Sequence, residues 1–224
     1  MSFTLPRPGR WLAAHLLALA FGADAACPAP AASALLERFI PADCDACWSA
    51  DGIPAGAPFV LDWIVPSPRG DAAPLSAAAL TEAASRAGAL PNDATLQRRQ
   101  ELPPLHGLSF SVHDGPAWSG YIGLQMVVQR SGAALPAGAV GYLALVENVR
   151  AGDEGTPIER RLVRALAGPF ALAGARSRFE HLVAVRLPVG AKPARLGAVG
   201  WVEVPSGQVI ALARAGSSDC TVAR

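Results

Sequence analysis

Apolar residues recur through the first half of the chain in runs that predict two strands and two helices. Residues 35–40 and 59–65 are mostly apolar and have the length of buried strands. Residues 76–87 are rich in alanine and are followed by Gly88, a composition that predicts a helix with a glycine stop. Residues 92–101 begin with Asn-Asp, which favours the start of a second, short and polar helix.

Beyond residue 105 the pattern changes to short strand-like runs separated by glycine and proline turns. Pro205-Ser206-Gly207 lies between the last two runs and is a hairpin signal. Residues 159–166 instead predict a short helix. Many short strands with such turns predict an antiparallel, sandwich-like module. The predicted strands are residues 108–113, 121–129, 139–149, 181–187, 196–204 and 208–214.

The N-terminal residues have the pattern of a secretory signal peptide. Basic residues precede an apolar run over residues 11–21, and Ala23-Asp24-Ala25 fits a small-x-small cleavage site. Residues 1–25 are therefore expected to be removed, and the mature protein to be periplasmic or secreted. Cleavage before Cys27, with lipidation of that cysteine, stays open as an alternative. No later stretch holds about 18 consecutive apolar residues, so no transmembrane segment is expected in the mature chain.

Composition and charge narrow the classes of function. Of the 224 residues, 51% are hydrophobic and 17% are charged, which is enough apolar material for a substantial core. The net charge of +1 gives no electrostatic support for a nucleic-acid partner. The sequence contains no Gly-x-Ser-x-Gly motif and no glycine-rich phosphate loop. His106, His113 and His181 lack the spacing of metal ligands, so neither a metal nor another cofactor is expected.

The cysteines carry the candidate chemistry. Cys44 and Cys47 are separated by two residues, so their thiols lie on one turn, where they can bond to each other or share a metal. Trp48, in place of a histidine, argues against covalent haem attachment. Export implies an oxidising compartment, in which cysteines tend to pair. If the local pair closes, Cys27 and Cys220 remain near the two ends of the mature chain, and a structural disulfide between them is expected.

The chain also resembles a known family, the secreted bacterial thioredoxin-like proteins of the domain of unknown function 1223 family. That family opens with a strand of the type Val-Glu-Leu-Phe-Thr before its Cys-x-x-Cys pair. The likeness extends loosely over about residues 33–215. The segments that carry it are residues 36–40 with the Cys44–Cys47 pair, 59–63, 147–155, 162–166 and 197–213.

The fold class expected from these features is α/β plus β. A strand that runs into a Cys-x-x-Cys turn is typical of thioredoxin-like domains, and the resemblance implies such a domain over residues 30–104. An antiparallel β-rich, sandwich-like domain is expected over residues 105–224. The family carries a cis-proline opposite its redox pair, and the nearest match here begins at Tyr121, with Gly123 at the proline position. If that run is instead a strand of the second module, the first domain is shortened.

The resemblance also assigns roles to individual residues. Cys44 is expected to be the attacking thiol and Cys47 the resolving thiol. Gly123, from the cis-proline match, is a candidate for the substrate pocket. Trp48 adjoins the pair and either shapes a small pocket or packs under the pair.

The leading hypothesis is an exported thiol–disulfide oxidoreductase whose partners are protein thiols or disulfides. Asp43 and Asp45 flank the first cysteine and disfavour a thiolate there by like charge. An inert disulfide that braces the turn therefore stays open. In that case the chain is a non-enzymatic periplasmic binding or assembly protein whose cysteines form structural disulfides.

Overall fold

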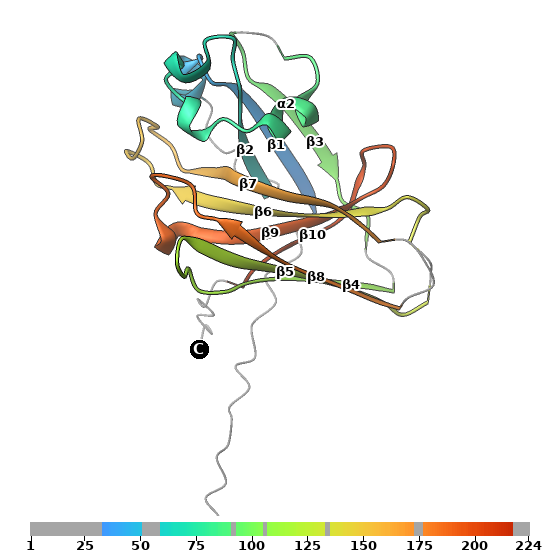
Figure 1. Cartoon of the computed structure of the whole chain (residues 1–224). Helices are drawn as coiled ribbons and strands as arrows, with labels where there is room; N and C mark the ends of the chain where they lie inside the picture. The colour runs from blue at the N-terminus through green and yellow to red at the C-terminus, as the bar shows by residue number, and fades with distance from the viewer. Residues whose placement is uncertain are drawn as a thin grey trace, which may run out of the picture.

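The computed structural model describes residues 33–50, 59–90, 93–104, 107–132, 135–172 and 177–216. These residues form ten strands, two α-helices and three short 3₁₀ helices (Figure 1). The strands are β1 (Ala34–Pro41), β2 (Phe59–Val65), β3 (Leu96–Glu101), β4 (Leu108–Asp114), β5 (Tyr121–Arg130), β6 (Val140–Val149), β7 (Arg160–Ala171), β8 (Arg178–Arg186), β9 (Leu196–Glu203) and β10 (Val209–Arg214). The helices are α1 (Asp45–Ser49), α2 (Thr81–Ala87), η1 (Gly70–Ala72), η2 (Ser76–Ala78) and η3 (Pro193–Arg195).

Seven of the strands form one mixed sheet in the order β10-β9-β6-β7-β2-β1-β3. β1 and β2 run parallel along the whole of β2, and β3 pairs antiparallel with the other side of β1. β2 also pairs in parallel with β7, where Asp62 lies opposite Leu162. Strands from both sides of residue 104 therefore share a single sheet. The domain limits expected from the sequence stay a prediction.

A three-stranded antiparallel sheet, in the order β4-β5-β8, packs against the seven-stranded sheet. Figure 1 shows it as the lower layer, beneath β6, β9 and β10. Apolar side chains from both sheets fill the space between the layers, among them the fully buried Leu124 and Met126 of β5 and Leu143 of β6. Along β5, buried and more exposed positions alternate, as expected for a strand with one face on the core.

The opposite face of the seven-stranded sheet carries helix α2 and two large buried side chains. Trp63 of β2 and Trp201 of β9 lie there with ring centroids 6.2 Å apart in an edge-on arrangement. Arg86 of α2 has its Cζ 5.0 Å from the Trp201 ring and donates to Glu37 at 2.5 Å and to Glu203 at 2.7 Å. Burial lowers the pKa of the Arg86 guanidinium, but the two carboxylates outweigh burial and raise that pKa above its ordinary value. These contacts fasten α2 to the sheet.

The expected α/β thioredoxin-like fold is wrong. The described residues are mostly strand, and their two α-helices have only five and seven residues. A thioredoxin-like α/β domain needs helices long enough to cover both faces of its sheet. Here the three-stranded sheet covers part of one face, and the seven-residue α2 lies on the other.

Two segments predicted as helices are strands. Residues 96–101 are polar but form β3, because they pair with the free edge of β1. β7 is rich in leucine and alanine, which favour helices, but it lies between β2 and β6, and its backbone bonds to both. Of the helix predicted over residues 76–87, only η2 and α2 form. The other strand predictions are confirmed, as is the β9–β10 hairpin.

Several expectations concern residues outside the described ranges. The signal peptide over residues 1–25 lies there, and so do Cys27 and Cys220, the expected structural disulfide. Within the described ranges, none of the helices has the length and hydropathy needed to cross a bilayer.

Gly200 of β9 lies at a tight contact between the two layers. A Cβ at this position would lie 2.8 Å from Val112 Cγ2 and 3.0 Å from the backbone oxygen of Tyr142. Neither group can move aside easily, so Gly200→Ala is expected to lower the free energy of unfolding by about 1–3 kcal/mol. Urea unfolding followed by tryptophan fluorescence measures this loss.

Gly141→Ala is the matched control for Gly200→Ala. Its added Cβ would meet Met126 Cε at 2.6 Å and Met126 Sδ at 2.8 Å, the far end of a flexible side chain. Because methionine repacks readily, the control is expected to lose less stability than Gly200→Ala. Equal losses at the two positions would contradict the prediction.

Candidate functional site

The cysteine pair lies at the carboxyl end of β1, where the chain turns into helix α1. The Cys44 backbone N–H donates to Pro41 O at 3.0 Å, which closes the turn. Cys44 and Cys47 are joined by a disulfide, with their Cα atoms 5.2 Å apart. The Cys47 backbone N–H donates to Cys44 Sγ at 3.2 Å, so the first sulfur caps the helix. The disulfide between these two residues confirms the local pairing expected from their spacing.

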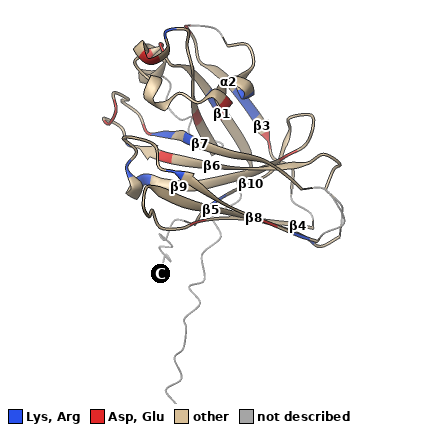
Figure 2. Cartoon of the chain, in the orientation of Figure 1, with Lys and Arg blue, Asp and Glu red and all other residues tan. Residues whose placement is uncertain are grey.

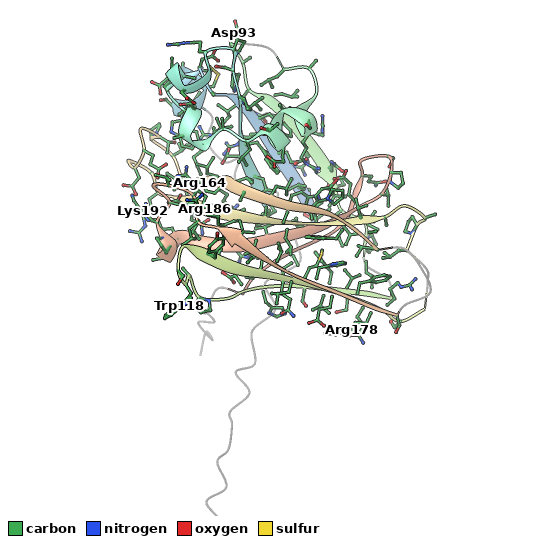
Figure 3. The ribbon with its side chains drawn as sticks, in the orientation of Figure 1. Asp93, Trp118, Arg164, Arg178, Arg186 and Lys192 are labelled. Atoms are coloured by element: carbon green, nitrogen blue, oxygen red, sulfur yellow. A yellow bond between two sulfur atoms is a disulfide. The ribbon has the colours of Figure 1, made fainter. Side chains whose placement is uncertain are left out.

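The two sulfurs have different surroundings. Cys44 is half-buried, whereas Cys47 is only 8% exposed. The Asp93 backbone oxygen lies 3.8 Å from Cys44 Sγ and 3.6 Å from Cys47 Sγ (Figure 3 labels Asp93). Sulfurs in a disulfide carry no hydrogen, so these distances are contacts in the oxidised pair. After reduction, a thiol at either position can donate to this oxygen.

Arg160 of β7 holds the C-terminal end of α1. Its Nη2 donates to the backbone oxygen of Trp48 at 2.5 Å, to that of Cys47 at 3.4 Å, and also to that of Ala50. Its guanidinium lies over the Trp48 ring, with Cζ 5.0 Å from the centroid. The last carbonyls of a helix have no partner within the helix, so a buried arginine that satisfies three of them fixes the position of α1.

Asp62 of β2 neutralises part of the positive charge behind the helix. Its carboxylate is fully buried and contacts Arg38 at 2.7 Å and Arg160 at 3.4 Å. It also accepts a hydrogen bond from the Arg161 backbone N–H at 3.1 Å. The sequence analysis did not single out Arg38, Asp62 or Arg160. A charge inside an apolar strand run, as at Arg38 and Asp62, is the signal that indicates a buried partner.

Trp48 is a buried residue of α1 that packs in the same apolar cluster as Cys47 and lines a small cavity. Its side chain is 2% exposed, and its Nε1 donates to Glu154 O at 2.8 Å. A cavity of about 150 Å³ next to it is also lined by Leu75, Glu154 and Arg164. The role of Trp48 in a substrate pocket stays a prediction.

The structure does not bring Gly123 to the cysteine pair. Gly123 lies on β5 of the three-stranded sheet, with Leu182 Cδ1 3.9 Å from the position of a Cβ. Figure 3 labels Trp118, which bridges to the first residue of β5, on the side of the molecule opposite Asp93. The run from Tyr121 is thus a strand of the β-rich half, the alternative left open by the sequence.

The described residues contain no cluster of three or more histidine, cysteine or acidic side chains arranged to hold a metal ion. His113 and His181 lie on β4 and β8, and the His181 ring stacks on Phe170 at a centroid distance of 4.8 Å. His106 lies outside the described ranges.

Comparisons with known proteins add a likeness of fold. No protein-family model matches the chain, and no curated protein sequence matches it. Among solved structures, the chain is similar to HBP35 of Porphyromonas gingivalis, with a TM-score of 0.53 and 11% sequence identity. The match covers 88% of this chain and 80% of that one. At this identity the likeness concerns the arrangement of the backbone alone, and the chemistry must be argued from the site.

Proposed function

We propose that the protein exchanges disulfides with partner proteins through Cys44 and Cys47. The observation that carries the proposal is the asymmetry of the two sulfurs. Cys44 Sγ is half-buried and accepts the Cys47 N–H, a bond that favours a thiolate at Cys44 in the reduced protein. Cys47 is buried, which favours the uncharged thiol at that position, whereas the Asp93 carbonyl lies near both sulfurs and does not distinguish them. Cys44 is thus the attacking group and Cys47 the resolving group.

The exchange takes place in two steps. In the reduced protein, the Cys44 thiolate attacks one sulfur of the partner's disulfide, and the partner's other sulfur leaves as a thiolate that takes a proton from water. The Cys47 thiol then loses its proton to water and attacks Cys44 Sγ, which breaks the mixed disulfide. The Cys44–Cys47 bond re-forms, and the partner's second sulfur leaves as a thiolate that takes a proton from water, so the partner ends with two thiols. The partner gains two electrons and the pair loses two. With an oxidised pair and a reduced partner, the same steps run in reverse.

Two features of the site set the expected rate. Arg160 holds the carbonyls at the end of α1, so the helix that carries Cys47 is anchored to β7. Asp43 and Asp45 lie next to Cys44 and repel a thiolate, so turnover is expected to be slow. The proposal includes an oxidising compartment outside the cytoplasm, where disulfide partners are plentiful.

The test traps the intermediate. Reduced Cys47→Ser, with full-length chain otherwise unchanged, is incubated with glutathione disulfide, and peptide mass mapping locates the adduct. A stable mixed disulfide at Cys44 is expected, because the resolving thiol is gone. Cys44→Ser is the matched control: the remaining sulfur of the pair, at Cys47, is buried, so adduct formation at Cys47 should be at least about 10-fold slower, the factor for 1.4 kcal/mol.

The reduction potential of the wild-type pair distinguishes a disulfide that exchanges with partners from one that only stabilises the turn. Exchange predicts a potential above about −300 mV, whereas an inert structural bridge lies below it. No adduct at Cys44, together with a potential below that limit, would establish the pair as a brace. The protein would then be a binding or assembly protein that uses no thiol chemistry.

A further inference from the structure

A cavity of about 420 Å³ opens on the face of the seven-stranded sheet opposite the disulfide. Successive side chains of a strand point to opposite faces of a sheet. Arg160 reaches the carbonyls of α1, and the next residue, Arg161, lines the cavity on the other face. The cavity volume lies within the range of small-molecule sites. No chemistry proposed for the cysteine pair uses this cavity.

Three guanidinium groups line the cavity, from β7, η3 and β10. They belong to Arg161, Arg195 and Arg214. Figure 2 shows basic positions in blue on β7 and at the start of β9, at the same end of the sheet. Asn148 of β6, opposite Arg161 in the ladder, adds a side-chain amide. Together they form a set of hydrogen-bond donors from four separate elements of the sheet and its connections.

Two of these arginines are held in place by their neighbours. The Arg161 guanidinium lies over the Phe59 ring, with Cζ 5.1 Å from the centroid. Arg195 forms an ion pair with Asp153, and this hydrogen bond lowers the pKa of the Asp153 carboxyl. Because the side chains are already positioned, a ligand would not have to order them on binding.

Two of the three arginines that line the cavity have no carboxylate partner among the described residues. Among the described residues, neither Arg161 nor Arg214 forms an ion pair with a carboxylate. Asp114 is the acidic residue of the lining. Burial raises the pKa of its carboxyl. Arg195 is paired with Asp153, so Arg161 and Arg214 are the two lining arginines that are available to bind an anion.

Apolar groups form the rest of the wall. Phe59, Val146 and Val199 line the cavity beside the arginines and belong to the same apolar cluster. Gly197 lies opposite Val146 in the β6–β9 ladder, so its missing side chain faces the same way as Val146. A Cβ at Gly197 meets no atom within 4 Å, which shows open space above this strand.

From this combination we infer that the cavity binds a small organic anion, a carboxylate or phosphate group carried on an apolar body. The planar fork of an arginine donates two parallel hydrogen bonds to either group. The apolar body would lie against Phe59, Val146 and Val199, which share one face of the sheet. The proposal is independent of the proposed disulfide exchange.

The test is isothermal titration of the full chain with phenyl phosphate, benzoate and inorganic phosphate at low ionic strength. Phenyl phosphate or benzoate is expected to bind with a Kd of about 1 mM or below. Whichever binds more tightly identifies the anionic group. Inorganic phosphate is expected to bind at least about 10-fold more weakly, because it lacks the apolar body. Equal binding of inorganic phosphate and phenyl phosphate would overturn the apolar part of the proposal.

Variants test whether anion binding depends on the cavity or only on the surface charge of the protein. Arg161→Gln with Arg214→Gln is expected to weaken binding at least about 10-fold. Gly197→Val keeps every arginine, suits a strand and fills the space, so it is also expected to weaken binding at least about 10-fold. Arg178→Gln, on β8 of the other sheet, is the control and should leave the Kd unchanged.

The proposal is overturned if no organic anion binds at 10 mM, about ten times the expected Kd. It is also overturned if Arg178→Gln weakens binding as much as the cavity variants. Far-ultraviolet circular dichroism and the urea midpoint of each variant confirm that the protein remains folded.

Discussion

Asp62→Ala is expected to lower the free energy of unfolding by about 3–5 kcal/mol, the cost of removing one partner of a buried ion pair. Asp62 is fully buried, and its carboxylate contacts the buried guanidinium groups of Arg38 and Arg160. Without it, two buried cations face each other with less compensating negative charge. Urea unfolding at neutral pH, extrapolated to zero denaturant, measures the loss.

Asp71→Ala is the matched control for this variant. Asp71 lies on η1, and its side chain is exposed. A surface carboxylate of this kind is expected to change stability by no more than about 0.5 kcal/mol. If Asp62→Ala costs less than about 1 kcal/mol, the buried charge network does not have the role assigned to it here.

Arg86→Met is expected to cost a similar amount, about 3–5 kcal/mol, because it leaves Glu37 buried without the guanidinium. Glu37 is fully buried and receives two hydrogen bonds from Arg86, at 2.5 Å and 3.2 Å. Methionine has a similar length and keeps much of the apolar contact with Trp201. The loss therefore reports mainly on the charge, and urea unfolding measures it.

A double variant tests this explanation directly. Arg86→Met with Glu37→Gln removes the buried carboxylate as well as the guanidinium, so it is expected to recover part of the stability lost in the single variant. Arg99→Met is the surface control: its pair with Glu101 has side chains 56% and 68% exposed, and a change within about 0.5 kcal/mol is expected. A double variant no more stable than Arg86→Met would mean that lost packing, not charge, causes the effect.

The parts of the fold that the sequence predicts are those specified locally. β1 and β2 are short apolar runs between turn residues, and the Pro-Ser-Gly turn joins β9 to β10. β3 has no apolar pattern of its own. It becomes a strand because β1 presents an open edge, and at that edge the side-chain oxygen of Gln100 also accepts the Val209 N–H at 2.9 Å.

β7 is a central strand whose sequence does not show the alternation expected of a strand. Leu162 and Val163 are both buried because elements cover both faces of the strand, so the alternation that marks a half-exposed strand is absent. Arg160 and Arg164 of the same strand are buried through contacts with Asp62 and Glu147. Charged and apolar residues in this order are as compatible with an exposed helix as with a central strand.

In the candidate site, too, the local contacts can be predicted from the sequence and the distant ones cannot. The spacing of Cys44 and Cys47 predicts their disulfide, since both lie on one turn. Arg160 follows Cys47 by 113 residues, and no local pattern connects them. The thioredoxin-like expectation failed for the same reason: a strand followed by Cys-x-x-Cys is a local feature, whereas the order of strands in a sheet is set by distant pairings.

The pairing of β2 with β7 also has a consequence for the timing of synthesis. Arg160, at the start of β7, follows Asp62 by 98 residues. At about 5–20 residues per second, a ribosome takes roughly 5–20 s to add that length. Throughout this interval the apolar strand β2 has no neighbour on the side that β7 later occupies. Such an edge pairs readily with strands of other chains. The rate of elongation, as well as the final set of contacts, therefore determines how long the nascent chain is open to aggregation.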